Sequence, residues 1–137
     1  FMGMGEPLHN YAAVLGACRG LQEVWDMAPA RITISTVGIV SKMRTLAADM
    51  PGVNLALSLH AATQERRLEL VPSSSSYTVE KIVRAMDDYI ERSGKAVMIE
   101  FILIEVRRAC GARLHDCPVG ARSGVQRTLR IDFGTAA

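Results

Sequence analysis

The sequence predicts an α/β fold built around a parallel sheet. Three runs of strand length and composition, at 31–36, 53–59 and 97–104, are separated by segments in which apolar residues recur every three or four positions. Strands that alternate with helices are typically joined by right-handed crossovers, which make neighbouring strands parallel. On this pattern alone, a piece of an α/β barrel and a small doubly wound sheet fit equally well.

The first part of the chain predicts the end of a strand, then a helix and a second strand. Phe1 leads directly into a Gly-rich segment that resembles a strand end, and because no Met precedes it we expect further residues upstream. Residues 11–24 have an amphipathic helical pattern, for which Asn10 is the expected N-cap. Residues 31–36 alternate β-branched and polar side chains, which predicts a strand that ends before Gly38.

The middle of the chain continues this alternation. Helical periodicity covers residues 40–47, and Pro51-Gly52 is the expected turn before the mostly apolar run 53–59. The composition of that run suits a strand in a sheet covered on both faces. A short charged helix is predicted over 64–71, and Pro72 ends it.

A longer helix precedes the last predicted strand. Residues 73–76 are four serines, which predict a polar loop. Thr78 is the expected start of a helix with an apolar face, and Gly94 is its expected stop. The strand over 97–104 is apolar apart from a single carboxylate, Glu100.

Residues 105–137 differ in character from residues 1–104. They have no sustained period and are rich in Gly and Arg, so we predict an α/β domain over 1–104 and a divergent, poorly ordered tail over 105–137. The three cysteines are irregularly spaced, which predicts no disulfide framework and a reducing compartment. Cys110, His115 and Cys117 match no common zinc spacing, so we predict no metal site.

Composition and charge narrow the classes of function. Hydrophobic residues make up 49% of the chain and charged residues 22%, which is typical of a globular protein, and no apolar run is long enough for a membrane helix. Residues 1–104 carry ten Lys and Arg against eleven Asp and Glu, whereas residues 105–137 carry six Arg against three acids. The larger part therefore has no electrostatic footprint for nucleic acid, and the basic tail alone is weak evidence for one.

Polar residues gather where the predicted strands end. They are Gly3-Met4-Gly5-Glu6-Pro7, Ser35-Thr36, Ser58-Leu59-His60, and Glu100 within the last strand. The carboxyl edge of a parallel sheet is the usual ligand site of α/β folds. The glycines allow a ligand to approach the backbone before Glu6, whose carboxylate suits an ammonium group. The hydroxyls of Ser35 and Ser58 suit a carboxylate or a ribose.

Each of these features also has a simpler structural explanation. A Gly-x-Gly segment without a third glycine is often only a turn, and a serine that closes a strand is often a helix cap. A lone His60 is often a hydrogen-bonded residue at the rim of a sheet. Glu100 is more unusual because a buried carboxylate needs a partner, and a salt bridge to Arg31 or Lys95 would supply one.

Longer strings of residues favour the functional explanation. FMGMGEPLHN at 1–10 resembles the FMGMGEPLxN stretch of the radical S-adenosylmethionine (SAM) adenine-C2 methyltransferases, a dual-specificity family that modifies 23S ribosomal RNA and transfer RNA. Further segments resemble the same family in the same order: RITISTVGIV at 31–40, LALSLHA at 55–61, LVP at 70–72 followed by Tyr77, and Glu100-Phe101. The resemblance covers residues 1 to about 104 and is highly specific in combination.

The resemblance implies a fold, a site, cofactors and partners. The fold is an incomplete α/β barrel of the radical SAM type, with SAM lying across the carboxyl ends of the strands. Gly5 and Glu6 match the pair that contacts the methionine part of SAM, and Ser35 and Ser58-Leu59-His60 match other SAM-contacting positions. Family members use a [4Fe–4S] cluster to cleave SAM. The implied partners are 23S rRNA and tRNA, with no DNA and no membrane, and the implied location is the cytoplasm, or a plastid if the source is a photosynthetic eukaryote.

Two departures from the family pattern bear on activity. The family's cluster cysteines form a CxxxCxxC loop upstream of the matched segment, and that spacing does not occur in this chain. Residues 105–137 match nothing in the family, so Cys110 and Cys117 are not assigned as its methyl-accepting cysteine. We therefore assign no catalytic residue and expect the isolated chain to be inactive. The alternatives are a non-catalytic SAM- or nucleotide-binding fragment, a truncated gene product, and an unrelated nicotinamide oxidoreductase, against which the missing third glycine argues.

Overall fold

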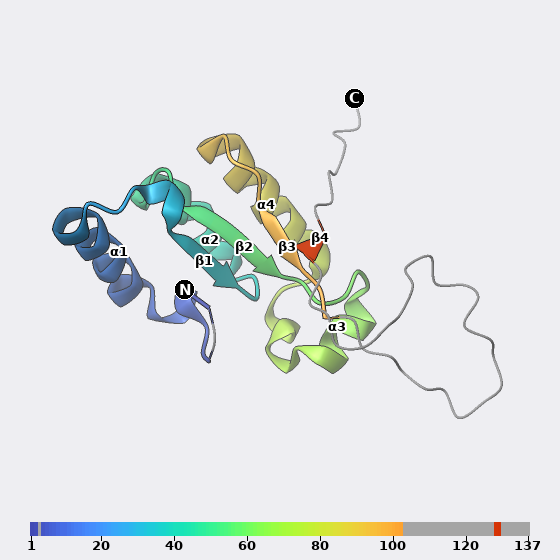
Figure 1. The fold of residues 1–137 in the computed structure, drawn as a ribbon. Helices are drawn as coiled ribbons and strands as arrows, with labels where there is room; N and C mark the ends of the chain where they lie inside the picture. Colours follow the sequence, from blue (N-terminus) through green and yellow to red (C-terminus); the bar gives the residue numbers. More distant parts are fainter. Residues whose placement is uncertain (3, 103–127, 130–137) are drawn as a thin grey trace.

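Three parallel strands form the centre of the structure, a computed structural model that describes residues 1–2, 4–102 and 128–129. The strands are β1 (Thr33–Thr36), β2 (Asn54–Ser58) and β3 (Met98–Glu100), and they lie in that order in the sheet (Figure 1). Both pairs of neighbours are parallel. The predicted α/β class with a parallel sheet is confirmed, although each strand is shorter than the apolar run that predicts it.

Four α-helices connect and flank these strands. They are α1 (Tyr11–Trp25), α2 (Val40–Asp49), α3 (Gln64–Leu70) and α4 (Val79–Ser93). Three short 3-10 helices lie between them: η1 (Pro7–Asn10), η2 (Pro29–Arg31) and η3 (Pro72–Ser76). The four serines predicted to form a loop are therefore a tight helical turn. Within the described residues, no helix is long and apolar enough to cross a membrane.

One face of the sheet is covered by helices, and Figure 1 shows α2 and α4 side by side behind it. The strand residues on that face are buried, and all of them except Thr36 are apolar, as Ile34, Leu57 and Ile99 illustrate. Facing them, the helices contribute Met43, Leu46, Ile82, Ala85, Met86 and Tyr89 to a continuous core. Burial of this much apolar surface is the main force that holds the sheet and the helices together.

The strand register places the polar strand residues on the opposite face. Ser35 pairs with Ala56, and Ser58, two residues further along β2, pairs with Glu100. Because side chains alternate between the two faces of a strand, Ser35, Ser58 and Glu100 share one face of the sheet. This is the face that lies away from α2 and α4.

The first residue of the chain lies along the free edge of β1. The Phe1 nitrogen donates to the Thr33 carbonyl at 2.6 Å, and the Phe1 carbonyl accepts a hydrogen bond from the Ser35 nitrogen at 3.0 Å. This alternation is the pattern of a parallel ladder. The prediction that the chain opens at the end of a strand is thus consistent with the pairing of Phe1.

The helix ends follow from local sequence in most cases. Thr78 accepts a hydrogen bond from the Lys81 nitrogen at the start of α4, and Gly94 ends this helix in the left-handed conformation, as predicted. Asn10 takes the N-cap position of α1 but its side chain makes no capping hydrogen bond. Residue Asp26 ends α1 with a positive φ of 49°, a conformation that Asp tolerates better than most residues.

A short fourth strand, β4 (Thr128–Leu129), pairs antiparallel with β3. The sequence analysis did not predict it, because two residues are too few for any periodicity to show. The rest of the predicted tail, including Cys110, His115 and Cys117, lies outside the described residues. The same is true of residues 103 and 104, at the end of the run that predicts β3.

Candidate functional site

Three polar side chains meet on the face of the sheet that lies away from α2 and α4, near the carboxyl ends of the strands. The Ser58 hydroxyl donates to Glu100 Oε2 at 2.9 Å, and the Ser35 hydroxyl donates to the same oxygen at 3.2 Å. The two hydroxyl oxygens are 3.2 Å apart. All three are candidates from their positions in the sequence, and the strand register brings them into direct contact.

The partner of Glu100 differs from the expected one. The salt bridge to Arg31 or Lys95 is wrong: the ammonium of Lys95 instead donates to the Gly52 carbonyl and to Asn54 Oδ1. The two serine hydroxyls stabilise the Glu100 carboxylate in place of a cation. Two hydroxyl donors on a half-buried carboxylate leave the local negative charge uncompensated within this cluster, which favours a cationic or hydrogen-bond-donating ligand.

Glu6 joins the segment that follows Phe1 to the loop that follows β1. Its Oε1 accepts a hydrogen bond from the Leu8 nitrogen at 3.0 Å, and its Oε2 accepts one from the Val37 nitrogen at 2.8 Å. The carboxylate therefore caps η1 and fixes the end of β1 at the same time. Gly5 before it has φ +89°, which only glycine adopts without strain, so Gly5 aims Glu6 at the strand edge.

The segment Ser58-Leu59-His60 bends sharply at the end of β2. The nitrogens of Leu59 and His60 both donate to the Glu100 carbonyl at 3.1 Å, and His60 has a left-handed φ of 62°. A non-glycine residue with this φ is uncommon and is often found at binding sites. The main chain of β3 thus holds the turn that carries His60.

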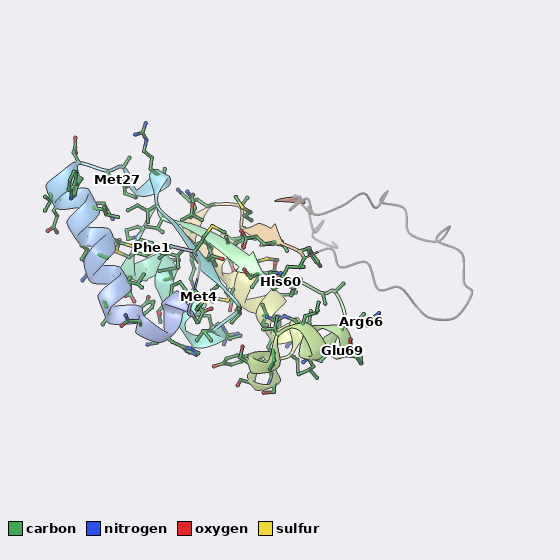
Figure 2. The ribbon with its side chains drawn as sticks, turned by 60° about the horizontal axis from the view of Figure 1, so that its bottom comes forward. Phe1, Met4, Met27, His60, Arg66 and Glu69 are labelled. Carbon is green, nitrogen blue, oxygen red and sulfur yellow. The ribbon has the colours of Figure 1, made fainter. Side chains whose placement is uncertain are left out.

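The side chain of His60 is half-buried, and its Nδ1 nitrogen is buried without a hydrogen-bond partner in the described part of the chain. Burial lowers the pKa of His60, an effect that the charge of Glu100 opposes and the charge of Arg67 reinforces. The neutral ring is therefore favoured. Figure 2 shows His60 near the carboxyl end of the sheet.

Arg67 is the residue that the sequence analysis missed. It lies on α3 and is fully buried, with Nε donating to the Leu59 carbonyl at 3.1 Å and an Nη2 nitrogen donating to the Val37 carbonyl. Arg67 therefore joins the loops that follow β1 and β2, and burial lowers the pKa of its guanidinium. Its neighbour Arg66 is exposed and pairs with Glu69 at 2.8 Å (Figure 2).

The residues described by the structure fit SAM but not an iron–sulfur cluster. Acceptor oxygens at the sheet edge match the ammonium and the ribose hydroxyls of SAM. A cluster needs thiolates, and among the described residues Cys18 is fully buried in the core, where burial raises the pKa of its thiol. No group of three or more His, Cys, Asp or Glu is positioned to hold a metal in residues 4–102.

Comparisons with known proteins give a consistent result. No protein-family model matches the sequence. A probable dual-specificity RNA methyltransferase RlmN 2 from Opitutus terrae is 44% identical over 85% of this chain, and the RlmN protein of Moorella thermoacetica is 41% identical over 95% of it. The crystal structure of a radical SAM methyltransferase from Sphaerobacter thermophilus matches 77% of the chain with a TM-score of 0.74 and 37% identity. The chain belongs to the RlmN family.

The chain matches only part of the length of the RlmN proteins. The chain spans 29% of the length of the Opitutus terrae relative, 35% of the Moorella thermoacetica relative and 31% of the Sphaerobacter thermophilus chain. The RlmN family is one of radical SAM methyltransferases, which in general use SAM and a [4Fe–4S] cluster. The fold expected from the resemblance, a partial radical SAM barrel, is confirmed by the structural match.

Proposed function

We propose that this chain is a SAM-binding segment of an enzyme that methylates C2 of adenine in 23S rRNA and tRNA. The observation that supports SAM binding is the position of six predicted residues at one edge of the sheet: Gly5, Glu6, Ser35, Ser58, Leu59 and His60. The relatives' names support RNA methylation. The adenine C2 position and the two RNA substrates rest on the resemblance of the sequence motifs alone.

In the proposed site, Glu6 and the two serines bind different parts of SAM. Glu6, held by the Leu8 and Val37 nitrogens, keeps carboxylate lone pairs for the methionine ammonium of SAM. Ser35 and Ser58 lie on the face of the sheet away from α2 and α4 and contact the ligand there. When bound, SAM supplies the methyl group and the source of the radical for the family's reaction. This chain's own residues bind and orient SAM.

Binding of SAM to the 137-residue chain tests the first part of the proposal. Glu6→Gln should weaken binding by about 1.5–3 kcal/mol, the scale of a hydrogen bond to a charged group. Ser58→Ala should cost less, about 0.5–1.5 kcal/mol, for a neutral hydrogen bond. Glu23→Gln is the matched control, since Glu23 is exposed on α1. Isothermal titration calorimetry gives the affinities, and equal affinity of Glu6→Gln and the unmodified chain would remove Glu6 from the site.

For the isolated chain we propose SAM binding without catalysis. The sequence contains no CxxxCxxC spacing, and Cys18 is buried in the core, so the described residues supply no cluster ligands. Anaerobic reconstitution with iron and sulfide, followed by an assay for 5′-deoxyadenosine, tests this. Turnover above background would contradict it. The intact mass of the protein from its natural source would show whether a CxxxCxxC peptide precedes Phe1.

A second candidate is a non-catalytic SAM- or nucleotide-binding protein. The structural feature that favours it is the buried Nδ1 of His60, which has no hydrogen-bond partner within the described part of the chain and whose use by a ligand would need no cluster. The two candidates share the site and differ in chemistry. RNA methylation by the protein from its natural source, measured on 23S rRNA and tRNA transcripts, separates them.

A further inference from the structure

We propose that Glu100 determines which ligand groups the site accepts. By drawing the hydroxyl protons of Ser35 and Ser58 to its own carboxylate, it makes both serines hydrogen-bond acceptors toward the ligand. The site then binds groups that donate hydrogen bonds, such as an ammonium or the hydroxyls of a ribose. This inference rests on the proposed SAM binding, and it adds a residue for which neither the comparisons nor the motif analysis supplies a ligand role.

The hydrogen-bond geometry leaves the two serines no free proton. Each serine has one hydroxyl proton, and the ionised carboxylate is an acceptor only. The three contacts of the cluster are Ser58 to Glu100 at 2.9 Å, Ser35 to Glu100 at 3.2 Å, and Ser35 to Ser58 at 3.2 Å. The two protons satisfy two of these three contacts at a time, and in each such arrangement both protons are used inside the cluster. What each serine offers to a ligand is therefore a lone pair.

The consequence is a choice between ligand groups. A carboxylate placed against Ser35 and Ser58 would meet two oxygens with no proton to give and a negative charge on Glu100, so it is disfavoured. An ammonium or a sugar hydroxyl can donate to the same oxygens without rearranging them. Of the two ligand groups that the sequence suggests for these serines, a carboxylate and a ribose, the cluster therefore disfavours the carboxylate.

Glu100→Gln is the direct test because the two side chains have nearly the same shape. The amide donates a proton to one serine, which frees that serine's own proton to point toward the ligand. A hydrogen-bond donor of the ligand then faces a serine hydroxyl that also donates, so the two groups cannot form a hydrogen bond. Glu91→Gln is the matched control, since Glu91 is exposed on α4. Three probes are titrated into each ¹⁵N-labelled protein and followed by NMR: SAM, 5′-methylthioadenosine, which lacks the amino-acid group, and methionine, which lacks the ribose.

The three probes show whether the ribose hydroxyls or the ammonium of SAM donate hydrogen bonds to the serines. Glu100→Gln should weaken SAM binding by roughly tenfold or more, as loss of a hydrogen bond within a charged cluster implies. If the donors are ribose hydroxyls, 5′-methylthioadenosine weakens with SAM and methionine is unchanged. If the donor is the ammonium, methionine weakens with SAM and 5′-methylthioadenosine is unchanged. An equal change for all three probes, or no change, would overturn the inference.

The outcome also distinguishes this inference from the proposed function. If the unmodified chain binds none of the probes, the proposed SAM binding and the role of Glu100 both fail. If the chain binds SAM and Glu100→Gln leaves the ratios between probes unchanged, only the role of Glu100 fails. A readout without ligand is the ¹³C chemical shift of the Glu100 side-chain carboxylate. Ser58→Ala should move it because a donor is lost, and an unmoved signal would show that Ser58 does not donate to Glu100.

Discussion

Replacing Arg67 by Met tests the role of the one buried guanidinium among the residues that the structure describes. Met is close to Arg in length and is apolar, so it fills the space but leaves the Val37 and Leu59 carbonyls without their donor. A buried carbonyl that loses its partner costs about 1–3 kcal/mol, and this applies in full to Leu59 and in part to the half-buried Val37. Part of this is offset because a charge is no longer buried. We therefore expect the free energy of unfolding to fall by about 2–4 kcal/mol.

The matched control is Arg66→Met, one residue earlier on α3. The Arg66 side chain is 52% exposed and its partner Glu69 is 62% exposed, so their ion pair should contribute less than about 0.5 kcal/mol. Urea denaturation of both variants, followed by far-UV circular dichroism, gives the two free energies. Equal small losses for the two variants would refute the conclusion that Arg67 holds the loops after β1 and β2 together.

Three further predictions concern the core, a turn and the effect of pH. Tyr89→Phe removes the hydroxyl that donates to the buried Val53 carbonyl at 2.7 Å. The midpoint of urea unfolding should therefore fall by the equivalent of about 1–2 kcal/mol. An unchanged midpoint would contradict that contact. Gly38→Ala should lower the free energy of unfolding by about 1–3 kcal/mol, because φ at this position is +106° and the new Cβ would lie 2.9 Å from Ile82 Cδ1. A melting temperature equal to that of the unmodified chain would show that the turn adapts to the new side chain. Folding lowers the pKa of His60. The neutral His60 ring therefore contributes to stability above about pH 6.5, the ordinary histidine pKa. This contribution is lost as the pH falls through the lower pKa of the folded state. Stability measured at pH 7.5 and 5.5 should show this loss in the unmodified chain and less of it in His60→Asn, a residue that tolerates the left-handed φ.

Much of the fold could be predicted from the sequence because its signals are local. The apolar period of α4 and the β-branched run of β1 each specify their own element, and Gly94 marks a helix end by its own conformational freedom. The positions of Ser35 and Ser58 at strand ends followed from the same patterns. Parallel strands that end at one edge bring such residues together whatever the details of packing.

The rest could not be predicted because it depends on contacts between distant elements. On α3 the usual pattern is reversed: Leu68 and Leu70 are exposed at 41% and 38%, whereas Arg67 is fully buried. Hydrophobic periodicity therefore points to the wrong face of this helix. The predicted salt-bridge partner of Glu100 was wrong for a similar reason. Lys95 is close in sequence, but the register of β3 against β2 puts Ser58 beside the carboxylate.

The most direct test of the account is to titrate SAM into the ¹⁵N-labelled 137-residue chain and record which backbone signals move. We predict that the moving signals belong to residues 5–6, 35–37 and 58–60, at the carboxyl edge of the sheet, and that the exposed end of α1 around Trp25 is unaffected. Absence of any shift at saturating SAM, or shifts confined to α1, would contradict the proposal that these strand ends form the SAM site.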